Sequence, residues 1–364
     1  MNRGKVLLAM SGGVDSSMAA ILLKEQGFEV TGVTYRSWDS ISKGCMEKET
    51  GCCSVDAIFE AKKMAQDLGF AHHIIDFRES FRETVINNFI NEYLSANTPN
   101  PCVLCNAHIK WGELLEKADE LDCEYIATGH YARIRKENGR YILSKGRDPL
   151  KDQSYFLWML SQDNLKRTLF PIGEYEKTSI KKMALERGLV KLSTKKESQE
   201  ICFIPDNDYR RFLKEQVPEI IEKIGTGEFV STDGKHLGTH QGYPFYTIGQ
   251  RKGLGVAAGY PLYVVDISKE TNTIVLGSRE ELGKKKMIVK DLILSKYDRI
   301  PDNMEVQTKI RYRNKGHFSR IRHSGNKAEI EFYEPIPAIT PGQSAVFYEQ
   351  NDLIGGGIIA ETQH

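Results

Sequence analysis

The chain has 364 residues, of which 40% are hydrophobic and 27% are charged, so it is long enough for two or three domains with ordinary cores. No stretch approaches the ~18–20 apolar residues of a membrane span, and the first residues lack the apolar core of a cleavable signal, so we expect a cytoplasmic protein without membrane contact. The formal net charge of +1 excludes a uniformly basic nucleic-acid coat, so any RNA contact must come from a local patch.

The first half of the chain alternates predicted strands and helices. Strands are predicted at 4–10, 29–35, 71–77 and 124–129, and helices at 14–26, 55–68, 79–95 and 107–121. This alternation is typical of βαβ units and predicts an α/β domain with a parallel sheet covered by helices on both faces. Residues 131–146 predict a hairpin that turns at Asn138-Gly139.

The composition changes after about residue 205. A short helical stretch at 207–223 precedes a Gly-rich region with short strands, and from about 285 strands alternate with turn signals. We therefore divide the chain into an α/β catalytic domain (1–205), a central β-rich bridging domain (206–280) and a C-terminal β domain of barrel or sandwich type (281–364).

The stretch Ser11-Gly12-Gly13-Val14-Asp15-Ser16 lies where the first predicted strand passes into the first predicted helix. Its glycines allow a ligand close to the backbone, and the amides at the helix start favour an anion. The loop lacks the Gly-Lys-Ser/Thr of the usual P-loop, which argues against kinase or GTPase chemistry. Asp15 beside phosphates would be explained by Mg²⁺, and an ordinary Gly-Ser turn capped by Asp15 is the alternative.

This loop resembles the pyrophosphate-binding SGGxDS loop of the PP-loop ATPases, which cleave ATP between its α and β phosphates. Further stretches resemble the tRNA 2-thiouridylase family within that group, in order over essentially the whole chain. They are "NTPNPCVLCN" (97–106), "YIATGHYAR" (125–133), "KDQSYFL" (151–157), "SQEICFI" (198–204), "YTIGQRKGLG" (246–255) and "TPGQSAVFY" (340–348).

The resemblance implies a PP-loop fold and an enzyme that adenylates the C2 oxygen of the wobble uridine, position 34, of tRNA. Sulfur then replaces that oxygen, and AMP and pyrophosphate are released. The implied partners are the tRNA anticodon arm and a sulfur donor protein or sulfide, with no DNA. Residue by residue, the implied ATP contacts are Ala9, Met10, Ser11, Gly12, Gly13, Val14, Asp15, Ser16, Tyr35 and Gly129. Asp15 would also act in catalysis with Mg²⁺, and Tyr35 could equally be a core aromatic.

Seven cysteines, an odd number spread over a long chain, indicate reduced thiols rather than a disulfide framework. The resemblance implies that Cys105 is the nucleophile and that Cys202 carries persulfide sulfur, so that sulfur release leaves a Cys105–Cys202 disulfide. Packing is the expected role of the remaining cysteines other than Cys102, which are Cys45, Cys52, Cys53 and Cys123.

Cys102 departs from the resemblance, because many members of the family carry Asp at this position. With Cys105 and Cys202 it supplies three thiolates, which suit a 4Fe–4S cluster whose fourth iron could bind sulfide. A zinc site would normally require a fourth protein ligand. A persulfide relay and a cluster both remain open.

Two groups of residues are predicted to contact RNA. The resemblance places Asn100, Pro101, Cys102 and His130 near the target base, Lys151, Asp152 and Gln153 at the anticodon arm, and Arg311, Tyr312 and Gln343 on the tRNA from the C-terminal domain. Independently, residues 309–323 contain six Lys or Arg, two His, Tyr312 and Phe318 but no acid. Such a mixture of cations and aromatics is typical of RNA binding.

Three other functions are compatible with parts of the sequence. A small-molecule ligase would use the PP-loop, but it would leave Cys105, Cys202 and the basic run without a role. A non-catalytic tRNA-binding protein with a structural metal would bind tRNA without ATP turnover. A thiolase of another tRNA position would share both the loop and the cysteines.

Overall fold

A computed structural model of the chain describes residues 3–38, 55–194, 201–301 and 303–363. Cys45, Cys52 and Cys53 lie outside the described residues. The chain forms two compact units: the first contains Met1–Ile86, Pro101–Asn207 and Asn351–Leu353, and the second contains Asn87–Asn100, Asp208–Gln350 and Ile354–His364. Within the described ranges, no helix has the length and apolar character needed to cross a membrane.

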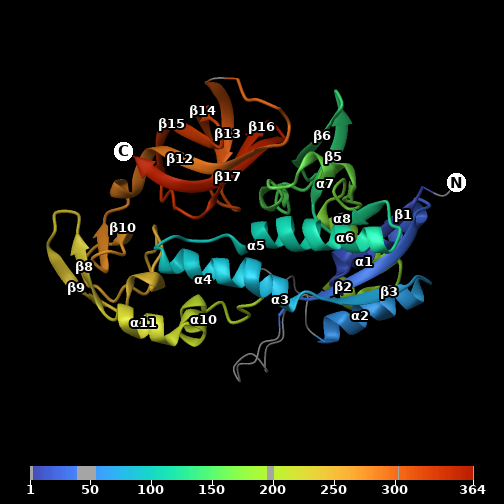
Figure 1. Ribbon diagram of the computed structural model, residues 1–364, viewed down its shortest axis with the longest axis horizontal. Helices are drawn as coiled ribbons and strands as arrows, with labels where there is room; N and C mark the ends of the chain where they lie inside the picture. The colour runs from blue at the N-terminus through green and yellow to red at the C-terminus, as the bar shows by residue number, and fades with distance from the viewer. Residues whose placement is uncertain (1–2, 39–54, 195–200, 302, 364) are drawn as a thin grey trace. The chain divides into compact units, whose positions relative to one another are not determined.

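The first unit is organised around a five-stranded parallel sheet (Figure 1). Its strands follow the order β3 (His72–Asp76), β2 (Glu29–Arg36), β1 (Lys5–Ala9), β4 (Tyr125–Ala127) and β7 (Thr168–Leu169). The central strand β1 is apolar because both of its faces are covered, and Val6, Leu7 and Leu8 are fully buried. The predicted parallel sheet is therefore confirmed.

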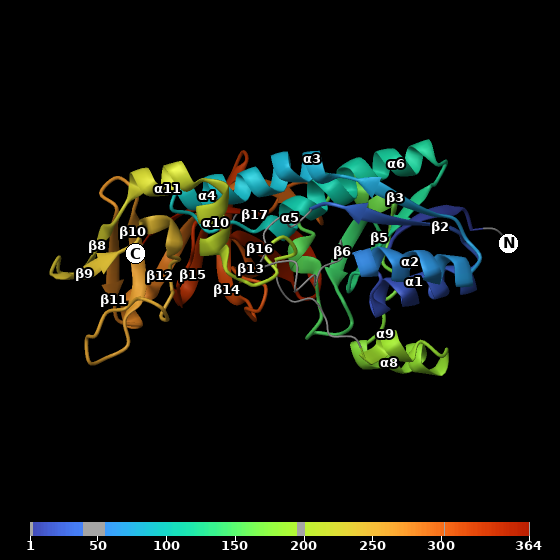
Figure 2. The same ribbon diagram turned by 90° about the horizontal axis from the view of Figure 1, so that it is seen from below.

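Helices cover both faces of this sheet. Figure 2 shows α1 (Val14–Glu25) and α2 (Val55–Asp67) on one face and α6 (Leu114–Glu120) on the other. Met18 and Leu22 of α1 and Ile180 of α8 (Lys177–Glu186) join Leu8 in one apolar core. This arrangement places the loop between β1 and α1 at the carboxyl edge of the sheet, where ligands bind in open α/β folds.

Two predicted helices have different boundaries in the structure. The stretch predicted at 79–95 is divided into α3 (Arg78–Phe81), a π-helical segment η1 (Arg82–Ile86) and α4 (Asn87–Leu94). The helix predicted from residue 107 begins at Pro101, as α5 (Pro101–Leu104), and continues through a π-helical segment η2 (Cys105–Glu113) into α6. Proline is favoured in a first helical turn because its missing N–H would be unpaired there, so the Asn-Pro dipeptide marks a helix start rather than a loop.

The predicted hairpin is present as β5 (Ala132–Glu137) and β6 (Arg140–Lys145). Asn138 and Gly139 have φ of 49° and 81°, the left-handed values that a two-residue hairpin turn requires. Within the same unit, Arg135 forms an ion pair with Asp352, whose carboxylate also accepts a hydrogen bond from the Ser144 hydroxyl at 2.8 Å.

Four further helices of the first unit were not predicted, and α8 is the most important because it carries a buried lysine. The others are η3 (Ser154–Phe156), α7 (Gln162–Lys166) and α9 (Val190–Thr194). Helix α7 begins with a capping box in which Ser161 and Asn164 exchange hydrogen bonds.

The second unit contains α10 (Tyr209–Gln216), α11 (Pro218–Ile224), a four-stranded sheet and a closed barrel. The sheet follows the order β10 (Tyr263–Ser268), β11 (Thr273–Gly277), β8 (Gly227–Ser231), β9 (His236–His240). The barrel strands are β12 (Gly283–Leu294), β13 (Met304–Lys309), β14 (His317–Ser324), β15 (Lys327–Pro337), β16 (Ser344–Glu349) and β17 (Asp352–Gln363).

Pairing of β12 with both β15 and β17 closes the barrel, which surrounds a core that includes Ile321, Ile330 and Phe347. An α/β parallel-sheet domain followed by β-rich and barrel domains was the predicted fold class, and it is confirmed.

Candidate functional site

The loop Met10–Ser17 follows β1 directly and forms a compact turn over the start of α1. Gly12 has a φ of 64°, and a Cβ there would lie 2.3 Å from the carbonyl oxygen of Ala57, so only glycine fits. The Ser16 hydroxyl donates to the Gly13 carbonyl at 3.1 Å and accepts from the Ser11 amide at 3.2 Å. These contacts fix the loop so that its backbone can surround an anion at the helix start.

Gly129 lies against this loop. A Cβ at Gly129 would approach the Ser16 amide nitrogen to 3.0 Å and the Asp15 Cβ to 3.2 Å. The end of β4 and the start of α1 are therefore in close contact, and this supports placing Gly129 beside a nucleotide in the loop.

Asp15 has a partner that the sequence did not predict. The Lys177 ammonium lies 2.6 Å from Asp15 Oδ2 and 2.8 Å from Oδ1, and the Tyr131 hydroxyl donates to Oδ1 at 2.7 Å. Lys177 is the first residue of α8, and its backbone amide donates to Asp148 Oδ2 at 3.0 Å. Its side chain is only 7% exposed, so a buried cation stands beside the loop.

This pairing bears on the predicted Mg²⁺. Both carboxylate oxygens of Asp15 are already engaged by Lys177, and one of them also by Tyr131. A metal at this carboxylate would compete with the ammonium for the same two oxygens, so we derive no step through Mg²⁺ at Asp15.

Tyr35 is the second-last residue of β2, and its ring packs against Phe77 with centroids 5.6 Å apart. The preceding Thr34 donates to the Met10 carbonyl at 2.8 Å and so connects β2 to the PP-loop. Tyr35 is thus close in sequence to a loop contact, and its ring belongs in part to the core. Its role at the nucleotide stays a prediction.

The two neighbouring cysteines lie on consecutive segments of one helical stretch. Cys102 belongs to α5 and is exposed, whereas Cys105 begins the π-helical segment η2 and is half-buried. π-helical turns are frequent at functional sites because they shift side chains out of the regular helical register. In this segment Lys110 donates to Asn106 Oδ1 at 3.0 Å, and Asn106 donates to the Phe156 carbonyl at 3.0 Å.

Lys110 is a second cation that the sequence did not single out. Desolvation by the surrounding protein raises the pKa of the Cys102 thiol, and the charge of Lys110 acts in the opposite direction. The Cys102 residue is nevertheless exposed at the surface. Desolvation, with Lys110 adding to it, lowers the pKa of His130 well below its usual range. His130 is therefore a neutral imidazole, with Nδ1 2.7 Å from the Thr128 hydroxyl.

Cys202 is exposed and is followed by two buried residues, Phe203 and Ile204. The Phe203 ring packs edge-on against Phe81, with centroids 5.8 Å apart. Buried neighbours thus anchor the segment and leave the thiol accessible. Among the residues that the structure describes, no three His, Cys, Asp or Glu side chains form a group that could hold a metal ion. The arrangement therefore does not fit a cluster held by Cys102, Cys105 and Cys202, and we derive no step through one.

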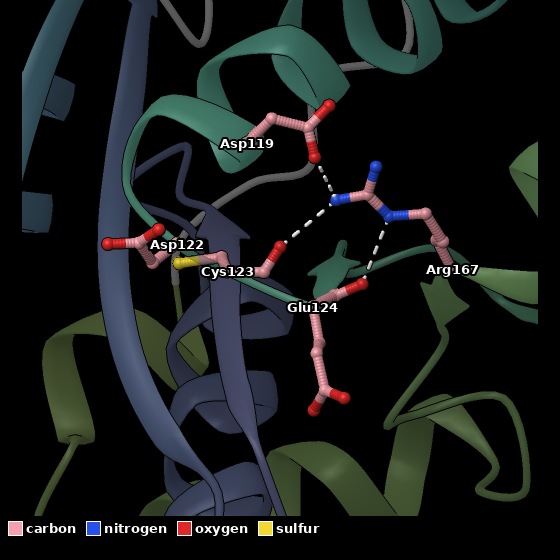
Figure 3. Close-up of a pocket in the computed structure, with 5 residues that line it drawn as sticks. All are labelled: Asp119, Asp122, Cys123, Glu124 and Arg167. Carbon is pink, nitrogen blue, oxygen red and sulfur yellow. Dashed lines mark hydrogen bonds and ion pairs between the residues drawn. The ribbon is translucent and has the colours of Figure 1, made fainter.

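A hollow of about 400 Å³ lies elsewhere in the first unit (Figure 3). Its lining includes Cys123 and Glu124, which directly precede β4, so it opens at the amino edge of the sheet, opposite to the PP-loop. The Arg167 side chain forms an ion pair with Asp119 at 2.6 Å and donates to the carbonyls of Cys123 and Glu124 at 3.0 Å. Arg167 thus ties down the turn before β4, and the buried Cys123 agrees with a packing role.

The three residues predicted at the anticodon arm differ in their surroundings. Lys151 is half-buried, but the side chain of Asp152 is buried and accepts hydrogen bonds from the amides of Gly146 and Ser154. Gln153 Oε1 accepts from the Tyr131 amide at 2.9 Å. Two of the three side chains therefore face the interior of the first unit.

In the second unit, Gln343 supports the segment before the cysteines. Its amide donates at 2.9 Å to the carbonyls of both Thr98 and Pro99, and Thr98 in turn donates to the Pro341 carbonyl at 2.9 Å. Asn100, in this segment, is half-buried, and Pro101, which follows it, is buried. Gln343 thus holds the backbone of a predicted RNA-contacting segment.

The basic run 309–323 occupies two different environments in the barrel. Arg320 and Arg322 on β14 lie opposite Glu331 and Glu329 of β15, and Arg320 also lies opposite Glu305 of β13. These acids, far away in sequence, offset the charge of the second half of the run.

The first half of the run belongs to the connection between β13 and β14. Arg311 donates to the Ala338 carbonyl, Tyr312 is half-buried, and Arg313 and Lys315 are exposed. Phe318, the second residue of β14, is 61% exposed. The exposed cations of this half thus lie in a connection between strands rather than on a paired strand.

Comparisons with known proteins agree along the whole chain. Family models match in chain order: residues 4–206 match a tRNA methyl transferase HUP domain, 210–278 a tRNA methyl transferase PRC-barrel domain, and 284–359 an aminomethyltransferase beta-barrel domain.

Relatives of known name are similar over nearly their full lengths. The chain is 55% identical to a tRNA-specific 2-thiouridylase MnmA of Cytophaga hutchinsonii, over 98% of this chain and 97% of that protein. It is 54% identical to the protein of the same name from Amoebophilus asiaticus, over 99% and 96%. A solved 4-thiouridine synthetase–RNA complex with bound ATP is 20% identical, with a TM-score of 0.34 over 60% of this chain and 51% of that one. By the extent and identity of the two full-length matches, the chain belongs to the family of tRNA-specific 2-thiouridylases.

Proposed function

We propose that this protein is a tRNA-uridine 2-sulfurtransferase, which uses ATP to replace the C2 oxygen of the wobble uridine with sulfur. The observation that carries the proposal is the presence, in one unit, of a preformed anion-binding loop with a buried cation and of accessible thiols at Cys102 and Cys202. The named relatives support the tRNA substrate and the thiolation.

The first step is adenylation. The uracil C2 oxygen attacks the α-phosphate of ATP, the bond to the β-phosphate breaks, and pyrophosphate leaves within the loop Ser11–Ser16. Lys177 offsets the negative charge that builds up on the phosphates, while Asp15 holds its ammonium in place. The oxygen thus becomes part of a good leaving group, AMP.

The second step is sulfur transfer. A sulfur donor protein, or sulfide with an oxidant, first charges Cys202 as a persulfide. The terminal sulfur attacks C2 and AMP departs, and the Cys105 thiolate then attacks the Sγ of Cys202. The sulfur remains on C2 with the electron pair of the broken S–S bond, and a Cys105–Cys202 disulfide forms. Cellular thiols must reduce this disulfide before the next turnover, which is consistent with a cytoplasmic enzyme.

The charge of Lys110 acts on both Cys102 and the neutral His130, and both side chains would border the target base. A neutral imidazole can accept or donate one hydrogen bond to uracil without adding a charge. Methyl transfer, the reaction in the descriptions of the matching family models, requires neither a pyrophosphate-binding loop nor thiols at Cys105 and Cys202.

The test is a reaction with unmodified tRNA, ATP and a sulfide or persulfide source. We expect equal amounts of AMP and pyrophosphate, both dependent on tRNA, and 2-thiouridine at position 34 in digested tRNA by mass spectrometry. A small-molecule ligase would form AMP without tRNA, a binding protein would form none, and another thiolase would leave sulfur at a different position. Any of these three results would replace the proposed activity.

A further inference from the structure

Gln153 and Tyr131 are joined by two reciprocal hydrogen bonds. The Tyr131 backbone N–H donates to the side-chain oxygen Oε1 of Gln153, and the Gln153 backbone N–H donates to the Tyr131 carbonyl, both at 2.9 Å. Because a backbone N–H can only donate, the side-chain atom facing Tyr131 must be the oxygen. The acceptor end of Gln153 is therefore used within the first unit.

Tyr131 contacts both members of the ion pair at the PP-loop. Its hydroxyl donates to Asp15 Oδ1 at 2.7 Å, and its ring centroid lies 5.7 Å from the Lys177 ammonium, within the range of a cation–π contact. The side chain is 3% exposed, so these contacts are shielded from water. A shift of Tyr131 would thus move the carboxylate and the cation together.

The chain around Tyr131 has little freedom. A Cβ at Gly146 would lie 2.7 Å from the Tyr131 carbonyl oxygen, and the Gly146 amide is held by the buried Asp152 carboxylate at 3.2 Å. Asp152 also accepts from the Ser154 amide at 3.1 Å and so fixes the turn that carries Gln153. The segment 151–154 therefore restrains the backbone of Tyr131, and Tyr131 in turn contacts the PP-loop.

We propose that Gln153 and Tyr131 are positioning residues for adenylation. Gln153 fixes the backbone of Tyr131, and Tyr131 holds Asp15 and Lys177 in the arrangement that receives the phosphates of ATP. This inference rests on the proposed adenylation at the PP-loop. It gives the Gln153 side chain a role inside the unit in place of the predicted contact with the anticodon arm.

Two variants of Gln153 distinguish these roles because they should rank in opposite orders. Gln153→Glu keeps an oxygen for the Tyr131 amide but loses the NH₂ donor and adds a negative charge, whereas Gln153→Ala loses the oxygen. If Gln153 positions Tyr131, Gln153→Ala should lower kcat for tRNA-dependent pyrophosphate release about ten-fold, Gln153→Glu should restore most of it, and the Kd for tRNA should stay unchanged. If Gln153 contacts RNA, Gln153→Glu should be the worse variant, since its charge repels phosphate, and the Kd for tRNA should rise.

Tyr131→Phe tests the second link, because it removes only the hydroxyl and keeps the ring. We expect a ten- to hundred-fold lower kcat for pyrophosphate release, with KM for tRNA and thermal unfolding close to the wild type. Tyr125→Phe is the matched control: its ring lies in the same unit against Phe28, with centroids 6.1 Å apart, and its kcat should not change.

The wild type separates failure of this inference from failure of the proposed function. If it releases no pyrophosphate with tRNA and ATP, the proposed adenylation fails. If it does so, and both Gln153→Ala and Tyr131→Phe retain its kcat, the positioning role is wrong while the proposed activity stands. A rise in the Kd for tRNA with unchanged kcat in Gln153→Ala would also overturn the role.

Discussion

The PP-loop and the cysteines belong to the same unit, but they differ in how completely the structure assembles them. At the loop, backbone turns, the Ser16 hydroxyl and the Asp15–Lys177 pair form one connected set of hydrogen bonds. At the cysteines, no metal-binding group forms within the described part of the chain, and Cys102, Cys105 and Cys202 are accessible to different degrees. The loop is thus ordered by its own contacts, whereas the three cysteines stand as separate thiols.

The largest expected effect separates sulfur transfer at the cysteines from adenylation at the PP-loop. Cys105→Ser and Cys202→Ser should each abolish 2-thiouridine formation, because a hydroxyl cannot carry or release persulfide sulfur. Single-turnover pyrophosphate release should persist, since the loop is intact. Cys123→Ala is the control, and its buried side chain beside Arg167 should leave thiolation unchanged. Equal loss of pyrophosphate release and thiolation in Cys105→Ser would show that sulfur transfer and adenylation are not separable.

The next effect concerns the ion pair at the PP-loop. Asp15→Ala, Asp15→Asn and Lys177→Met should each lower tRNA-dependent AMP formation about 10²–10³-fold, the usual cost of losing one charge-stabilising group, and tRNA binding should stay nearly intact. Because both residues act as one pair, the double variant Asp15→Asn with Lys177→Met should be no worse than either alone.

Lys182→Met provides the control for Lys177. It removes a lysine from the same helix whose side chain is 79% exposed, so AMP formation should not change. Titration with Mg²⁺ distinguishes the alternative role of Asp15. If Asp15→Asn needs more Mg²⁺ than the wild type, and Lys177→Met needs the same amount as the wild type, Asp15 is a metal ligand.

The loop and the lysine beside it differ in how far they could be predicted from the sequence. The Ser11–Ser16 loop was predictable because its function depends on local order: a strand, glycines that allow tight turns, and a helix start. Lys177 was not, because it lies 162 residues from Asp15 and its helix shows nothing in sequence that marks its first lysine as buried.

Two further differences between the sequence predictions and the structure concern a helix start and the basic run. The parallel sheet followed from alternating apolar strands and helices. The helix start at Pro101 was missed because the helical pattern was recognised only from residue 107. The basic run appeared uniform because Glu305, Glu329 and Glu331 are brought beside it only by strand pairing.

Cys102→Ser distinguishes a persulfide relay from an iron–sulfur cluster at the cysteines. In a persulfide relay Cys102 only borders the base, so thiolation should fall a few-fold and Cys202 should still form a persulfide, detected by mass spectrometry after alkylation. Metal analysis of the protein purified without oxygen should show no change in iron between the wild type and the variant. Iron and sulfide in the wild type, lost together with activity in Cys102→Ser, would instead establish a cluster, because a thiolate is a far better iron ligand than a hydroxyl.

The smallest effect compares the two halves of the basic run in the barrel. Arg313→Ala should weaken tRNA binding a few-fold and reduce the log–log salt slope by about one, as expected for one lost phosphate contact. Arg320→Ala should change neither, because Glu305 and Glu331 lie opposite Arg320 and its guanidinium packs 5.6 Å from the Tyr333 ring centroid. Arg311→Ala should also weaken binding, but part of its effect would come from releasing the Ala338 carbonyl. Filter binding at several salt concentrations measures both affinity and slope. A larger loss of slope in Arg320→Ala than in Arg313→Ala would move the RNA contact onto the sheet face of β14, despite the acids that flank it.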